Sequence, residues 1–179
     1  DPYGGDAADM VTYCLFPEQL ARGPLSVAAA AAMQSLMGTY FVYKHGSEDL
    51  RPRYLVPALP GDLIATFALT EPNAGSDVAA ITTRAERRGD RYVLRGTKTW
   101  VTSAPVADLL TVAAKTSDER GMKNIALFLL DRSRMRGITL GKSIDKMSVR
   151  GSVTGEILLE DVEVPVEHLL GGETGGVEK

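Results

Sequence analysis

The segment Leu69-Thr-Glu-Pro-Asn-Ala-Gly-Ser-Asp77 places Pro, Asn, Gly and Ser in close succession. Small residues of this kind let backbone N–H groups approach an anion, and the hydroxyl groups of Thr70 and Ser76 add two donors. The segment therefore predicts a loop that can hold a diphosphate, although an ordinary turn between two strands would use the same residues. The glycine spacings of the Rossmann and P-loop nucleotide sites are absent from the sequence.

The segment Gly96-Thr-Lys-Thr-Trp-Val-Thr102 contains the only tryptophan of the chain. In an extended strand Trp100 and Thr102, which are two residues apart, lie on the same face. An indole ring beside a hydroxyl donor suits the binding of a planar heteroaromatic ring. The alternative interpretation is a core tryptophan with a threonine neighbour.

These two segments, together with others along the chain, resemble the acyl-CoA dehydrogenase family. The matching motifs are Tyr3-Gly-Gly5, His45-Gly-Ser-Glu48, Arg53-Tyr-Leu55, Phe67–Asp77, Gly89-Asp-Arg-Tyr92, Gly96–Thr102, Lys146-Met-Ser-Val-Arg-Gly-Ser152 and Leu159-Glu-Asp-Val-Glu-Val-Pro165. Each motif alone would be weak, but they occur in the family's order and cover essentially the whole chain.

The resemblance implies an FAD-dependent enzyme that removes two hydrogens from Cα and Cβ of an acyl thioester. The family has an N-terminal helical domain, a middle β-domain and a C-terminal four-helix domain. Matched by motif, the expected flavin contacts are Phe67, Leu69, Thr70, Gly75, Ser76, Trp100, Val101 and Thr102. Phe67 and Leu69 are expected to act through backbone groups, Trp100 to pack beside the isoalloxazine ring, and Thr102 to bond near its reactive edge.

The same resemblance implies contacts with an acyl-CoA or acyl-carrier thioester. Ser76 and Val78 are expected along the pantetheine path, and Lys123 is a candidate for CoA phosphates. Three residues of one helix are expected to face the acyl tail, namely Ala28, Ala32 and Leu36. Their small side chains favour a longer or branched acyl group, although tight helix packing explains the alanines equally well.

The family's reaction needs a carboxylate that removes the α-proton while the β-hydrogen leaves as hydride to flavin N5. In the family this base is a glutamate of the C-terminal domain, to which nothing in this sequence corresponds. Glu71 matches a structural glutamate and is not proposed as catalytic. We therefore expect a fragment that lacks the base, is inactive alone and binds FAD poorly.

The expected partners of the full-length protein are an electron-transfer flavoprotein or similar acceptor, and further copies of itself in a homodimer or homotetramer. Two alternatives stay open. One is a related flavin enzyme that acts on a carrier-bound acyl chain or a nitroalkane, and the other is a non-catalytic flavin- or acyl-CoA-binding subunit.

The predicted secondary structure that positions these residues changes from helices to strands near residue 60. Helices are predicted over residues 7–21, 25–44 and 48–55, with Pro17 either kinking the first or starting a new helix. The second helix contains the alanine run Val27–Ala32 and is apolar on nearly every face, so we expect it to be buried. Ser47 is a candidate N-cap for the third.

Beyond Pro60-Gly61 the pattern is one of short strands, with a hairpin turn at Gly89-Asp90. The fold class predicted is α+β, a helical N-terminal segment followed by an antiparallel β-barrel or sandwich. The expected division is a partial helical domain over 1–60, a flavin-binding β-domain over 61–170, and a linker over 171–179.

Composition excludes several other classes of function. The formal net charge of -3 and pI near 5.5 argue against nucleic acid as a partner. One cysteine, Cys14, and two histidines give no metal site. The most apolar run, Leu25–Met37, falls short of the roughly 18–20 residues of a membrane span, and no signal peptide is evident. A cytoplasmic location, or the mitochondrial matrix in a eukaryote, is expected.

Overall fold

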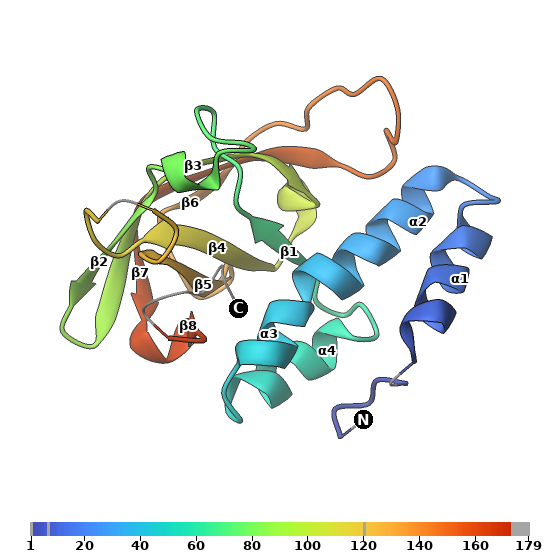
Figure 1. Ribbon diagram of the computed structural model, residues 1–179, viewed down its shortest axis with the longest axis horizontal. Helices are drawn as coiled ribbons and strands as arrows, with labels where there is room; N and C mark the ends of the chain where they lie inside the picture. The colour runs from blue at the N-terminus through green and yellow to red at the C-terminus, as the bar shows by residue number, and fades with distance from the viewer. Residues whose placement is uncertain (1, 7, 120, 173–179) are drawn as a thin grey trace.

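The computed structural model describes residues 2–6, 8–119 and 121–172, so that most of the expected linker, residues 173–179, lies outside the described residues. A group of helices from the first third of the chain lies beside a strongly bent sheet formed by the rest (Figure 1). The α+β class predicted from the sequence is therefore confirmed.

The helical part begins with α1 (Met10–Leu20), which is capped by the Asp9 carboxylate accepting from Thr12 N at 2.7 Å. Pro17 lies inside this helix. A long helical segment follows, made of α2 (Leu25–Ala32), a π-helical stretch η1 (Met33–Gly38) and α3 (Tyr40–His45). A second π-helical stretch, η2 (Arg51–Leu55), leads into α4 (Val56–Ala58). Ser47 Oγ accepts from Leu50 N at 3.2 Å, as expected of an N-cap.

The expectation that the long helix is buried on nearly every face is wrong for the described chain. Ala28, Gly38, Thr39 and Val42 are buried, whereas several large apolar side chains are 43–57% exposed, namely Leu25, Val27, Leu36, Tyr40 and Tyr43. By length and composition the segment Leu25–His45 could cross a membrane, a test that core helices of soluble proteins and signal sequences also pass. The absence of a membrane span stays a prediction.

Glycine in the π-helical stretch lets the long helix approach the sheet closely. A Cβ on Gly38 would meet the backbone of Ala65, with the carbonyl carbon at 2.8 Å. Four residues earlier, Gln34 donates to Ala58 O and Leu63 O and accepts from Ala65 N, each at 2.9 Å. The helix is thereby fixed to the start of the first strand.

Among the residues that the structure describes, eight strands form one sheet: β1 (Ala65–Ala68), β2 (Arg84–Arg88), β3 (Arg91–Thr102), β4 (Leu109–Lys115), β5 (Ile125–Asp131), β6 (Ile138–Leu140), β7 (Thr154–Pro165) and β8 (Leu169–Leu170). Short 3₁₀ helices occupy three connections: η3 (Val78–Ala80), η4 (Ala104–Val106) and η5 (Val166–His168). The predicted hairpin is present, with Gly89 at a φ of 64° between β2 and β3.

The sheet order is β6-β7-β3-β2-β4-β5-β8, with β1 beside β4. Among the described residues β6 and β8 do not pair, so the sheet is not closed and the barrel is not confirmed. Two pairings, β1 with β4 and β2 with β4, are parallel, so the purely antiparallel prediction is wrong. Local turn signals do not report such pairings, because they join strands distant in sequence.

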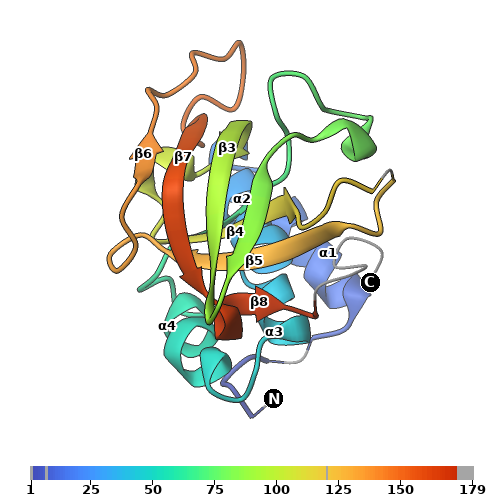
Figure 2. The ribbon, with the colours of Figure 1, turned by 90° about the vertical axis from the view of Figure 1, so that its left-hand side faces the viewer.

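Strands β4 and β5 cross β3 and β7 and form the centre of the molecule (Figure 2). Leu110, Val112 and Phe128 belong to a core enclosed by the sheet itself. Leu127 and Leu129 belong to a second core, shared with the helices. Every residue of β5 is buried, which explains why its sequence is apolar from Ile125 to Leu130 before Asp131 ends the strand.

Candidate functional site

The loop after β1 and the tryptophan-bearing strand β3 lie side by side, as predicted. Thr99 N donates to Thr70 O at 2.9 Å, and Lys98 Nζ donates to Leu69 O at 3.0 Å. At the other end of this contact, Thr66 Oγ1 donates to Thr102 O. The loop and the strand are thus joined directly at Thr70–Thr99 and Leu69–Lys98, and β1 itself contacts the end of β3 through Thr66.

Trp100 is 59% exposed, so the alternative of a core tryptophan is wrong. Its φ is 57°, in the left-handed region, and the pairing of β3 with β7 shifts between Lys98 and Val101. This β-bulge breaks the two-residue alternation from which a shared face for Trp100 and Thr102 was predicted. Val101 is buried in the sheet core and Thr102 is half-buried, so Val101 can offer a ligand only its backbone.

The loop after β1 offers hydrogen-bond donors to a ligand. Leu69 and Thr70 are half-buried, and within the described chain their amide N–H groups have no hydrogen-bond partner. Gly75 and Ser76 are exposed, and nothing lies within 4 Å of the position a Cβ on Gly75 would take. Unpaired N–H groups beside an exposed indole fit a cofactor with a planar ring and an anionic arm.

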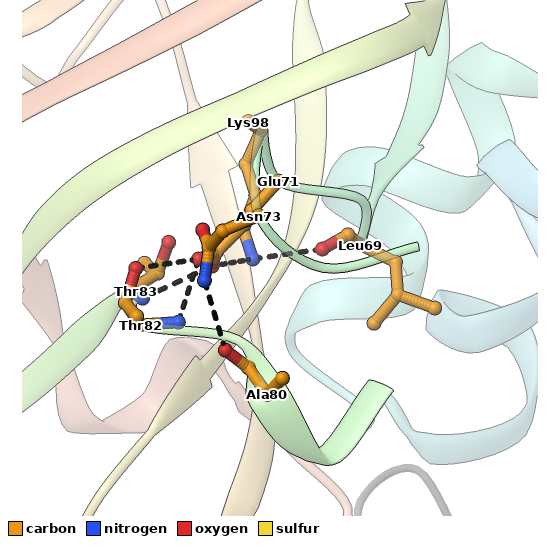
Figure 3. Close-up of polar contacts among 7 residues, drawn as sticks. All are labelled: Leu69, Glu71, Asn73, Ala80, Thr82, Thr83 and Lys98. Carbon is orange, nitrogen blue, oxygen red and sulfur yellow. Dashed lines mark hydrogen bonds and ion pairs between the residues drawn. The ribbon is translucent and has the colours of Figure 1, made fainter. Parts of the chain in front are cut away.

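A buried ion pair under this loop was missed by the sequence reasoning (Figure 3). Lys98 Nζ lies 2.8 Å from Glu71 Oε1, and the side chains are 0% and 1% exposed. Glu71 also accepts from Thr82 N, Thr82 Oγ1 and Thr83 N at 2.6–3.0 Å. The structural interpretation of Glu71 agrees with this bonding. The position of Glu71 directly before Pro72 and Asn73, in a loop motif, was the only signal in the sequence that it has a structural role.

The electrostatics of the pair are set by competing effects. Burial alone would raise the pKa of Glu71, but hydrogen bonds from Lys98, Thr83 and Thr82 outweigh it and hold the pKa at about 2. Burial lowers the pKa of Lys98, and its bond to Glu71 opposes that shift. Glu71 is therefore an ionised acceptor near neutral pH, unsuited to act as a general base.

The residues predicted to contact substrate lie on the long helical segment, in the loop after β1 together with η3, and in the loop before β5. Ala28 is buried, Ala32 half-buried and Leu36 exposed along the long helix. Ser76 is exposed, whereas Val78 packs against the core shared with the helices and contributes little open surface. Near Ala28, Ser26 Oγ accepts from Gly151 N at 3.1 Å, which ties the loop before β7 to the helix.

Lys123 lies in an open groove of about 490 Å³, which Arg87, Ser117 and Asn124 also line. The neighbouring arginines of the hairpin are largely paired, Arg88 with Glu86 at 2.9 Å and Arg95 with Asp161. These ion pairs lie on an exposed face of the hairpin, where carboxylates balance the arginines.

A larger groove, of about 770 Å³, lies between η2, the tip of the β2–β3 hairpin and β7. Its lining includes Arg53, Tyr54, Arg136 and His168, and none of the predicted site residues. Tyr54 OH donates to Asp131 at 3.2 Å, and His168 Nδ1 lies 2.8 Å from Leu129 O. These buried groups are satisfied within the fold.

Comparison with known proteins agrees with this geometry. Residues 66–162 match the family model "Acyl-CoA dehydrogenase, middle domain", and residues 1–62 match "Acyl-CoA dehydrogenase, N-terminal domain". Benzylmalonyl-CoA dehydrogenase of Aromatoleum aromaticum is 45% identical over 172 residues, covering 96% of this chain and 45% of that protein. The chain belongs to the acyl-CoA dehydrogenase family.

Solved structures give the same assignment. A glutaryl-coenzyme A dehydrogenase in complex with glutaryl-CoA superposes with a TM-score of 0.94 at 32% identity, over 99% of this chain and 45% of that one. A glutaryl-CoA dehydrogenase from Mycobacterium smegmatis in complex with FADH2 has a TM-score of 0.86 at 34% identity, over 93% and 42%. The chain spans about half the length of the relatives it matches.

Proposed function

We propose that this chain is the flavin- and thioester-binding part of an FAD-dependent acyl-CoA dehydrogenase. The observation that carries the proposal is the joining of the loop after β1 to the Trp100 strand, through Thr99 N–Thr70 O and Lys98 Nζ–Leu69 O. It is supported by the family membership and by relatives whose structures hold FADH2 or glutaryl-CoA.

In this proposal bound FAD supplies the acceptor for the hydride that leaves Cβ of the acyl chain. Trp100 covers the flavin ring with its exposed indole, and Thr102 donates near the reactive edge. The N–H groups of Leu69 and Thr70 bind electron-rich atoms of the cofactor, while Gly75 and Ser76 bind its diphosphate arm. These groups bind and orient the cofactor and exclude water from it.

The proton acceptor is proposed to come from the part of the family's length that this chain does not span. Glu71 is excluded from that role because it is buried and held ionised by four hydrogen bonds. The chain alone is accordingly proposed to be inactive, with weak affinity for FAD.

The proposed substrate is an acyl-CoA thioester with a longer or branched acyl group. Ala28 and Ala32 leave room along the helix, and a relative named for benzylmalonyl-CoA supports a bulky acyl chain. Lys123 and Ser117 line a groove that suits CoA phosphates. An electron-transfer flavoprotein as acceptor and a homo-oligomeric state belong to the same proposal.

The test is to express the full-length protein and measure FAD content and acyl-CoA oxidation across chain lengths. Trp100→Ala and Thr102→Ala are expected to weaken FAD binding or shift the flavin absorbance, while Glu163→Gln on the exposed end of β7 leaves both unchanged. Unaltered occupancy and spectrum in both site variants would contradict the placement of the ring. A clear activity optimum at four carbons would contradict the acyl-chain assignment.

A further inference from the structure

Lys98 is an unusual residue because its ammonium group is completely buried in the sheet. Its side chain is 0% exposed, and it donates to two acceptors that differ in kind, the carboxylate of Glu71 and the backbone carbonyl of Leu69 (Figure 3). Removing an ammonium group from water is costly even when it is paired. Simple attachment of the loop does not account for this cost.

Attachment of the loop to β3 does not require this charge. Thr99 N already bonds to Thr70 O at 2.9 Å, one residue along from each of the groups joined by Lys98. Glu71 is fixed independently by Thr82 N, Thr82 Oγ1 and Thr83 N. What Lys98 alone supplies is a positive charge at 3.0 Å from the Leu69 oxygen.

That oxygen belongs to the peptide group whose N–H is the amide of Thr70. A cation at the carbonyl end draws electron density from the peptide and makes its N–H a stronger donor, as in any chain of polarised hydrogen bonds. Within the described residues the Thr70 N–H has no acceptor in the protein. The strengthened donor is thus directed to whatever binds beside the loop.

We propose that Lys98 is a positioning residue that polarises the Leu69–Thr70 peptide, so that the Thr70 N–H binds the reduced, more electron-rich state of FAD more tightly than the oxidised state. Glu71 holds the ammonium in place. The inference rests on the proposed flavin site. It assigns to a residue that does not touch the cofactor a share in setting the cofactor's reduction potential.

The experiment compares two variants of the FAD-loaded full-length protein. Lys98→Met with Glu71→Gln removes both charges together, which avoids leaving one buried charge unpaired. Thr82→Val is the matched control, because it removes a bond to Glu71 without touching the Leu69 carbonyl. The measurements are the flavin reduction potential, the affinity for oxidised FAD and thermal unfolding of the apoprotein.

In the double variant the preference for reduced over oxidised FAD is expected to fall by about 1.3- to fourfold, since cooperative polarisation adds about 10–30% to the strength of a hydrogen bond to an electron-rich acceptor. For a two-electron couple this corresponds to a potential lower by about 3 to 18 mV. Thr82→Val is expected to lower the unfolding temperature and leave the potential unchanged.

Each outcome separates the inference from the proposed function. An unchanged potential in the double variant, or an equal shift in Thr82→Val, overturns the polarising role while the flavin site stands. If the double variant fails to fold, Lys98→Arg is measured instead, because it keeps the positive charge. Its flavin reduction potential is expected to equal that of the unmutated protein, and a lower potential also overturns the polarising role of Lys98. Failure of the unmutated protein to bind FAD overturns the proposed function itself.

Discussion

The Glu71–Lys98 pair predicts a specific loss of stability in acid. Glu71 is 1% exposed, and its pKa falls from an ordinary 4.5 to about 2 because the bonds from Lys98, Thr83 and Thr82 exceed the opposing effect of burial. A carboxylate with a lowered pKa contributes stability that is complete above the unfolded value and is lost as the pH falls through the folded value. The affected window is therefore pH 4.5 down to about 2.

The size of the effect follows from the difference between the two pKa values. A difference of about 2.5 units, at about 1.36 kcal/mol per unit, corresponds to roughly 3 kcal/mol in the free energy of unfolding. This is a large part of the 5–15 kcal/mol typical of a folded domain. Glu71 is thus expected to be a leading cause of acid unfolding.

The assay is urea unfolding at several pH values between 7 and 2.5, followed by circular dichroism. The Glu71→Gln, Lys98→Met double variant is expected to lose about 2.5 kcal/mol less than the unmutated protein over this range, because the folded pKa of Glu71 lies just below its lower end. Glu163→Gln is the control, since its pair with Arg91 is exposed and worth about 1 kcal/mol or less. Equal acid sensitivity of the double variant and the unmutated protein would refute the reasoning.

Two further substitutions test the packing and the thioester site. Gly38→Ala is expected to destabilise the protein by about 2 kcal/mol, because the new Cβ would lie 2.8 Å from the carbonyl carbon of Ala65 and a steric cost of up to about 3 kcal/mol exceeds the helix-propensity gain of about 1 kcal/mol. Gly75→Ala is the control, because the space around Gly75 is open. A Gly38→Ala variant more stable than the unmutated protein would contradict the close approach of helix and strand. Lys123→Ala is expected to weaken CoA binding several-fold at low salt and less at high salt, measured by calorimetry; a loss independent of salt would argue against a phosphate contact.

The part of the site that could be predicted from the sequence is the part that depends on residue types and their order within short segments. The loop residues around Gly75 and the aromatic–hydroxyl strand of Trp100 are recognisable by residue type and order, and the structure joins them through Thr70 and Thr99. Their individual roles toward FAD remain predictions. The hairpin at Gly89 was also predictable, because its turn requires a residue that tolerates positive φ.

Features that depend on distant pairing were not predictable. Lys98 lies between two threonines in the sequence, which indicates a solvent-facing residue, and only the fold brings Glu71 to within 2.8 Å of it. The parallel pairing of β1 with β4 likewise joins Ala65 to Leu109, far apart in sequence. The apolar content of the long helix indicated burial, but Leu36 and Tyr40 are exposed because burial depends on the neighbours and not on the helix alone.

The bulge in β3 explains how one strand can bury a lysine and expose a tryptophan two residues later. In a regular strand Lys98 and Trp100 would share a face. The bulge places one extra residue in β3 opposite β7, and Trp100 within it has a left-handed φ of 57°. Lys98 and Val101 are therefore buried, while the indole of Trp100 is exposed. Such a φ is strained for any residue with a Cβ. Trp100→Gly is therefore expected to be more stable than Trp100→Ala by about 1 kcal/mol in chemical denaturation, although glycine normally destabilises a strand. The opposite order would mean that the strand can straighten, in which case the site would depend on the ring of Trp100 and not on the bulge that presents it.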